Sequence, residues 1–229
     1  MSNDNKAINR AAIFFIIINA AIYLGFLTID LYIPKLGFVS SYFKFSGLVF
    51  CFLFTFFVRV RSDIKEVRYD ASIQISVLLF TMIADVFLLF TGHFLIGIFV
   101  FYCAHLMAVK RFRPEVLIIY CVVAVAGIIA AAFFYFVVSA QAGILCASAF
   151  YAFLIISVTV FAFKGEEPGR FPIAGFGMIC FLICDIFVAI YNSLPVIKPV
   201  YDTAAILMWA CYLPAQTLLA ISTAYRKRA

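Results

Sequence analysis

The sequence predicts an all-α integral membrane protein, folded as an eight-helix transmembrane bundle. Of its 229 residues, 67% are hydrophobic and only 12% are charged, whereas soluble domains average about half apolar and about a quarter charged residues. The apolar residues form continuous runs of roughly the 20 residues that a helix needs to cross a bilayer. They do not alternate with polar residues as in a membrane β-barrel. Basic residues, finally, gather in every second connecting segment.

Short polar segments separate the first four predicted spans. The run at 11–29 is longer than the apolar region of a usual signal peptide and lacks a convincing cleavage site, so we interpret it as the first span. The second span, 41–58, ends at the charged segment 59–70. The third span, 71–91, ends at a "TGH" turn, and the fourth covers 94–109.

The last four spans follow the same pattern. The fifth, 115–138, follows the basic segment "KRFRP" at 110–114. The sixth, 142–163, follows "SAQA" at 139–142. The segment "FKGEEPGRFP" precedes the seventh, 173–191, and the eighth covers 203–222. Because no connecting segment could hold a soluble domain, we expect residues 1–229 to form a single polytopic transmembrane domain.

The net charge of +6 reflects topology rather than a polyanionic partner. With the N-terminus placed in the cytoplasm, 14 basic residues fall on that side and only Lys35 and Lys198 on the other, as the positive-inside rule requires. We therefore expect no nucleic-acid partner, and both termini in the cytoplasm. A bacterial inner membrane is the expected location, with an internal eukaryotic membrane as the alternative. The cytoplasmic set is Lys6, Arg10, Arg59, Arg61, Lys65, Arg68, Lys110, Arg111, Arg113, Lys164, Arg170, Arg226, Lys227 and Arg228.

Two spans carry the same short pattern around an aspartate. The third span contains "ADVF" at 84–87, and the seventh contains "CDIF" at 184–187. Both spans run from the cytoplasmic side outwards. Helices 1–4 and 5–8 are therefore candidates for two parallel repeats, an arrangement that occurs in membrane proteins.

Four ionisable side chains fall within the spans: Lys44, Asp85, His105 and Asp185. Such residues cost about 2.5–3.5 kcal/mol at a helix centre and usually mark a functional interior. At a rise of about 1.5 Å per residue, both aspartates lie roughly 9 Å below the outer surface. For single residues there are simpler interpretations: Lys44 extending towards the headgroups, or an aspartate paired with it for assembly. The whole group favours a polar site.

The last span adds further polar groups. Tyr212 and Gln216 lie four residues apart and share one helix face. Pro214 between them has no N–H, which leaves the carbonyl of Ala210 without its helical donor. Two other residues have simpler interpretations: Asp30, at the border of a span, is expected at the membrane interface, and Trp209 is expected in part to anchor its helix there.

The polar residues lie in motifs that resemble a known family. The motifs are "YFKFSG" at 42–47, "MIADVFLL" at 82–89, "IGIFVFYCAHLM" at 96–107, "GMICFLICDIFVA" at 177–189 and "ACYLPAQTLLA" at 210–220. In order and spacing they resemble the YhhN-like membrane proteins, which include the lysoplasmalogenases. Phe45 stands where that family has proline, Ala84 and Cys184 where glycine or serine is common, and Ala108 where tyrosine is usual. Residues 84 and 184 are still small, so we expect close helix packing there.

The resemblance implies hydrolysis of the vinyl-ether bond of lysoplasmalogens, which gives a fatty aldehyde and a glycerophospho-alcohol. This reaction needs a general acid and a carboxylate, a division of labour that two carboxyl groups in different environments can provide. Asp85 and Asp185 are the expected catalytic pair, with His105 as a third catalytic residue that orients water or the leaving group. Gln216 and Tyr212 are expected beside the substrate, and Lys44 at its phosphate.

Other functions remain open from the sequence. A proton- or cation-coupled transporter or lipid carrier would also keep carboxylates inside the membrane. A packing or sensor subunit, or hydrolysis of another lipid bond, are further alternatives. We expect neither a metal nor another cofactor, because two histidines are too few for the usual catalytic zinc site. The expected partners are a lysophospholipid substrate and membrane lipid, and the sequence leaves the oligomeric state open.

Overall fold

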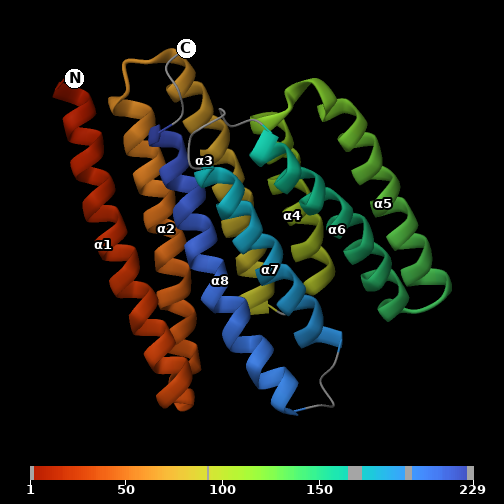
Figure 1. The fold of residues 1–229 in the computed structure, drawn as a ribbon. Helices are drawn as coiled ribbons and strands as arrows, with labels where there is room; N and C mark the ends of the chain where they lie inside the picture. The colour runs from red at the N-terminus through yellow and green to blue at the C-terminus, as the bar shows by residue number, and fades with distance from the viewer. Residues whose placement is uncertain (1–2, 92, 165–171, 194–197, 226–229) are drawn as a thin grey trace. The chain divides into compact units, whose positions relative to one another are not determined.

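The computed structural model describes residues 3–91, 93–164, 172–193 and 198–225. Within these ranges the chain folds into helices only, and eight of them are long and apolar enough to cross a membrane (Figure 1). The predicted fold class is thus confirmed. The helices are α1 (Asn3–Tyr32), α2 (Gly37–Arg61), α3 (Lys65–Val86), α4 (Phe94–Phe112), α5 (Leu117–Val137), α6 (Ala140–Lys164), α7 (Ile173–Ser193) and α8 (Lys198–Tyr225), with short turns η1 (Pro34–Leu36), η2 (Phe87–Thr91) and η3 (Pro114–Val116).

Each predicted span corresponds to one observed helix, but most helices are longer than their apolar runs. The first helix begins at Asn3, before the predicted start at 11, and the last begins at Lys198 rather than 203. Apolar residues mark only the hydrocarbon layer, whereas helical hydrogen bonding continues through the polar residues on either side. Hydropathy therefore underestimates the length of most helices, although α5 (Leu117–Val137) lies within its predicted span of 115–138.

The chain divides into two compact units. Unit 1 contains residues 1–75 and 171–229, and unit 2 contains residues 76–170. The first half of α3 therefore belongs with α1, α2, α7 and α8, and its second half with α4, α5 and α6. This division does not coincide with the predicted repeats of helices 1–4 and 5–8, which remain a prediction.

Small residues bring the helices of unit 1 together. The hairpin of α7 and α8 is its most extensive contact, and α1, α2 and α8 pack against one another (Figure 1). Gly177 of α7 lies against Leu219 of α8, and Gly47 of α2 lies against Leu213. Between membrane helices there is no water to expel, so close backbone approach at small residues supplies much of the attraction.

Two polar side chains of α1 form hydrogen bonds with neighbouring helices. Asn19 donates from Nδ2 to Thr217 Oγ1 on α8 at 3.1 Å and to Cys51 Sγ on α2 at 3.3 Å. Tyr23 donates its hydroxyl hydrogen to the carbonyl of Ala210 at 3.0 Å. This is the carbonyl that Pro214 was predicted to leave without a donor, and the tyrosine supplies the missing partner in place of water.

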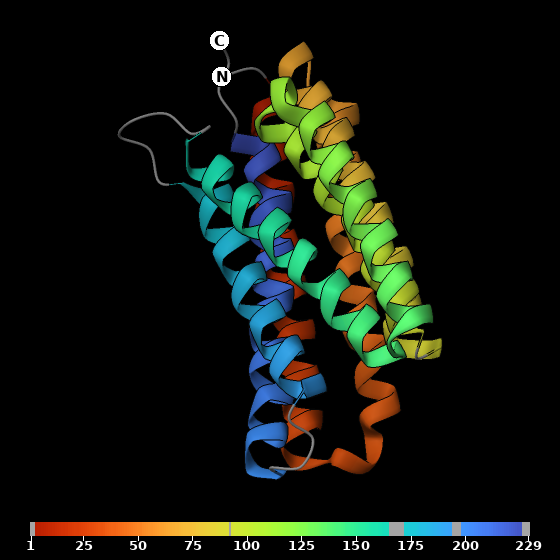
Figure 2. The same ribbon diagram turned by 90° about the vertical axis from the view of Figure 1, so that its right-hand side faces the viewer.

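The α5–α6 hairpin of unit 2 turns tightly at Ser139 (Figure 2). The Ser139 hydroxyl oxygen accepts from the Ala142 N–H at 3.1 Å and caps the start of α6. One turn into α6, Gly143 faces Tyr135 and the Ala131 carbonyl of α5. Tyr102 of α4 donates its hydroxyl hydrogen to a carbonyl of α6 at 2.8 Å.

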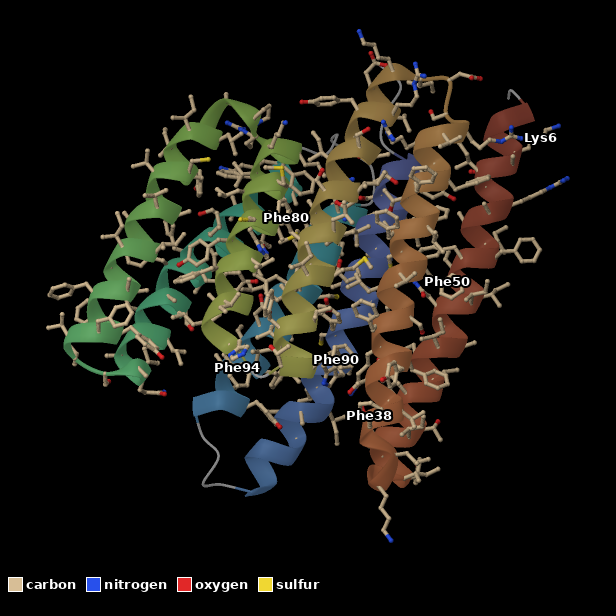
Figure 3. The ribbon with its side chains drawn as sticks, turned by 180° about the vertical axis from the view of Figure 1, so that it is seen from behind. Lys6, Phe38, Phe50, Phe80, Phe90 and Phe94 are labelled. Carbon is tan, nitrogen blue, oxygen red and sulfur yellow. The ribbon has the colours of Figure 1, made fainter. Side chains whose placement is uncertain are left out.

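Large apolar side chains cover the outer faces of several helices. Phe14 of α1 is 66% exposed and Phe136 of α5 is 84% exposed. On α2, Phe38 and Phe50 project from the helix (Figure 3) and are 67% and 36% exposed. Apolar faces of this extent are suited to contact with lipid, not water, and agree with the membrane assignment.

Replacing Gly143 with alanine should destabilise the α5–α6 hairpin. A methyl group there would lie 2.8 Å from Tyr135 Cα and 2.9 Å from the Ala131 carbonyl oxygen. Both atoms belong to the backbone and cannot rotate away, so we expect a loss of about 1–3 kcal/mol. Unfolding in mixed detergent micelles measures it. Gly37→Ala is the matched control, because no atom lies within 4 Å of its added methyl; equal effects of the two changes would contradict the packing.

Tyr23 and Pro214 should be energetically coupled through the Ala210 carbonyl. Tyr23→Phe leaves that carbonyl unpaired and should cost about 1–3 kcal/mol. In a Pro214→Ala background the new N–H of residue 214 bonds the same carbonyl, so the tyrosine change should cost markedly less. A double-mutant cycle of unfolding free energies measures the difference, and additive effects of the two changes would refute the pairing.

Candidate functional site

The predicted site residues divide between the two units. Lys44, Asp185, Tyr212 and Gln216 belong to unit 1. Asp85 and His105 belong to unit 2. The pairing of the two aspartates therefore stays a prediction.

Lys44 is buried, and its ammonium is paired with a residue that the sequence did not single out. Its Nζ lies 2.8 Å from Asp30 Oδ2, and the two side chains are 8% and 17% exposed. Asp30, which was expected at the membrane interface, is the counter-ion of Lys44. The two residues lie near facing ends of consecutive helices, α1 and α2, joined by the short turn η1. Their closeness in the sequence could have indicated that the two residues pair.

Aromatic rings enclose the ammonium of Lys44. Its Nζ lies 4.3 Å from the ring centroid of Trp209 and 5.6 Å from that of Phe26. Such cation–π contacts favour a charge that has left water. Trp209, expected in part to anchor its helix in the interface, thus covers a buried charge. It also meets Tyr212 edge-on at 5.5 Å, and Tyr212 meets Phe181 of α7 at 5.9 Å.

Gln216 lies one turn beyond Tyr212 on α8, as the spacing predicted. Its side chain is fully buried, and neither Oε1 nor Nε2 has a hydrogen-bond partner among the described residues. A buried amide without partners costs about 1–3 kcal/mol per unsatisfied group. This position therefore favours any polar group that can both accept and donate a hydrogen bond.

Asp185 lies on α7, in the helix that packs most extensively on α8. It follows Phe181, which contacts Tyr212, by one helical turn and is partly exposed. The preceding residue, Cys184, is 3% exposed. Small size at 184 was predicted to permit close packing, and the burial of Cys184 agrees with that.

In unit 2, Asp85 lies at the C-terminal end of α3 and is only 4% exposed. Ala84 beside it is fully buried, and Gly97 of α4 approaches the Ala84 carbonyl and the Leu88 side chain. The burial of Ala84 agrees with the close packing that was predicted there. The helix then widens into a π-turn over Phe87–Thr91. Such turns are frequent at functional sites.

His105 of α4 is 2% exposed, and its Nδ1 lies 3.0 Å from the carbonyl oxygen of Phe101. A carbonyl can only accept, so the hydrogen of the neutral ring is on Nδ1 and the basic lone pair is on Nε2. Tyr151 of α6 packs edge-on against the ring at 5.1 Å. His105 follows Gly97 by eight residues, roughly 12 Å along the helix axis.

A groove of about 370 Å³ runs between α1 and α8 within unit 1. Its lining is almost entirely apolar and includes Ile16, Ala20, Tyr23, Pro214 and Leu218. Asn19 contributes its amide to the groove. No sequence pattern indicated this groove, because it depends on how two helices distant in the sequence pack.

A comparison with known proteins gives one match. The family model for the YhhN family matches residues 39–223, which is most of the chain. No curated protein and no solved structure matches the chain. The matched region includes all six predicted site residues, while Asp30 precedes it. With its eight membrane-spanning helices and this match, the chain belongs to the YhhN family.

Proposed function

We propose that this protein hydrolyses the vinyl-ether bond of lysoplasmalogens within the membrane. Membership of the YhhN family is consistent with this activity. The observation that carries the proposal is a carboxyl group, that of Asp85, buried to 4% exposure inside a helix of a membrane protein. A buried carboxyl group is expensive in a membrane helix, and a chemical role accounts for that cost.

The reaction needs several proton transfers. A carboxylic acid donates its proton to the outer carbon of the vinyl group, which leaves an oxocarbenium ion at the carbon bonded to oxygen. Water adds to that carbon while a carboxylate accepts a proton from the water. In the resulting hemiacetal the first group, now a carboxylate, takes the hydroxyl proton, while the second, now a carboxylic acid, protonates the glycerol oxygen as its bond to carbon breaks. A fatty aldehyde and a glycerophospho-alcohol are released.

Asp85 and Asp185 take the roles of acid and base, in an order that we leave unassigned. The basic lone pair of His105 Nε2 positions water or the departing oxygen. Gln216, whose amide has no partner among the described residues, offers both a donor and an acceptor to the same groups, with Tyr212 one turn away. Lys44 contacts the substrate phosphate. The substrate reaches the site laterally from the bilayer, so the site needs no opening to the aqueous phase.

We further propose that the protein resides in a bacterial inner membrane with both termini in the cytoplasm. The distribution of basic residues supports this orientation. Figure 1 shows the start of α1 and the end of α8 at the same end of unit 1, as an even number of spans requires.

Asp85→Asn and Asp185→Asn should each lower turnover about 10²–10⁴-fold, because each change removes one proton donor or acceptor. The measurement is aldehyde release from 1-alkenyl lysophosphoethanolamine by the detergent-purified protein. Asp63→Asn is the matched control, since Asp63 is exposed between α2 and α3. The 1-alkyl analogue, whose saturated ether cannot be protonated at carbon, should give no product.

Two outcomes would refute this proposal. Wild-type protein that releases no aldehyde with any headgroup, but accumulates a substrate in vesicles under a pH gradient, would be a transporter. Aspartate variants that lose folding, with a lower unfolding midpoint and normal turnover per folded molecule, would assign the carboxylates to assembly instead.

His105→Asn and His105→Gln should separate structure from chemistry. Asparagine places an amide hydrogen near Nδ1 and keeps the bond to the Phe101 carbonyl, but has no atom near Nε2. Glutamine reaches the Nε2 position and can accept a hydrogen bond there. We expect both variants to fold, with turnover reduced about 10²-fold in His105→Asn and less in His105→Gln. The reverse order would mean that the bond to Phe101 matters more than Nε2.

A further inference from the structure

The proposed reaction gives a role to Lys44 but none to its partner, Asp30. A phosphate requires only the lysine, yet the structure gives that lysine a carboxylate at 2.8 Å. Asp30 also lies outside the region that the family model matches.

Both partners of this pair retain bonding capacity. An ammonium group has three hydrogens and a carboxylate has about four acceptor positions, so one mutual contact leaves donors on Lys44 and acceptors on Asp30. Asp30 is the more exposed of the two, at 17% against 8%. A ligand therefore reaches the pair from the side of the carboxylate.

The location suits a lipid headgroup. Asp30 lies two residues before the end of α1, and Lys44 lies seven residues into α2, roughly 10 Å along its axis. The flexible side chain of lysine can direct its ammonium back towards the headgroup layer. This end of unit 1 is the one predicted to face away from the cytoplasm.

The net charge of the pair is zero, which selects for a ligand whose net charge is also zero. A purely anionic ligand would pair with Lys44 but would place a second negative charge next to Asp30. A purely cationic ligand would do the reverse beside Lys44. A zwitterion contributes one charge of each sign, and the four charges then alternate around a ring, with each charge next to its opposite.

We propose that Asp30 and Lys44 together recognise the phosphoethanolamine headgroup of a lysolipid, in which Lys44 binds the phosphate and Asp30 binds the ammonium. This inference rests on the proposed function for the class of lipid, and it adds Asp30 as the residue that determines headgroup preference.

The surrounding rings favour ethanolamine over choline. A quaternary ammonium group donates no hydrogen bond and is usually held on aromatic faces. Here the faces of Trp209 and Phe26 are directed to Lys44 at 4.3 and 5.6 Å. A primary ammonium donates hydrogen bonds to the Asp30 carboxylate and needs no ring.

The experiment measures binding without hydrolysis. Trp209 is the single tryptophan of the sequence and lies against Lys44, so its fluorescence reports on this position. The ligands are 1-alkyl lysolipids with phosphoethanolamine, phosphocholine or bare phosphate as headgroup, titrated into the full-length protein in detergent micelles. Their saturated ether excludes the proposed reaction, so a failure of the hydrolysis proposal leaves this measurement interpretable.

We expect the wild type to bind the ethanolamine lipid about tenfold or more tightly than the other two, the range of a charge-assisted hydrogen bond. Asp30→Asn should weaken binding of the ethanolamine lipid to the level of the others, and Asp30→Glu should restore the preference. Lys44→Gln should weaken all three lipids, because each carries a phosphate.

The matched control is Glu115→Gln, which removes the carboxylate of the exposed Arg113–Glu115 pair and should leave every affinity unchanged. Equal affinities of the wild type for the three lipids would overturn the inference, whatever the stability of the variants. An unchanged preference for the ethanolamine lipid in folded Asp30→Asn would also overturn it. The ion pair would then serve only to hold α1 and α2 together. Equally tight binding of glycerophosphoethanolamine, which has no chain, would exclude a lipid as the ligand.

Discussion

The hydrocarbon layer offers no water to a polar group, and the structure depends on how each such group finds a partner within the protein. Asn19 bonds to two helices at once, and Tyr23 supplies the hydrogen that Pro214 cannot give to the Ala210 carbonyl. Lys44 is held by Asp30 and by aromatic faces. Each contact joins different helices, so the polar groups also fix which helices of unit 1 are neighbours.

The same constraint separates the buried polar groups that have a partner within the described part of the chain from those that do not. Several buried polar atoms are satisfied close by in the chain, as when His105 Nδ1 donates to the Phe101 carbonyl. That bond fixes the tautomer and leaves the lone pair on Nε2. Gln216 is different, because its fully buried amide has no partner among the described residues.

The sequence predicted the fold well for a simple reason. Crossing a bilayer requires about 20 apolar residues in a helix whatever the neighbours are, so eight runs predicted eight helices. Local effects could also be predicted from the sequence. Proline has no N–H whatever surrounds it, and the residues at 84 and 184 are small enough for close packing in any fold. Helix ends were predicted less well, because hydropathy does not record where hydrogen bonding stops.

What the sequence determined was therefore local: the class of fold, the polar residues within the spans, and the resemblance that the family match confirmed. Only the tertiary structure revealed that Asp30 neutralises Lys44, that Trp209 covers it, and that α1 and α8 enclose a groove. These features join residues from different helices. The contribution of a side chain on one helix depends on the rotation and depth of the next, and a linear pattern of hydropathy specifies neither.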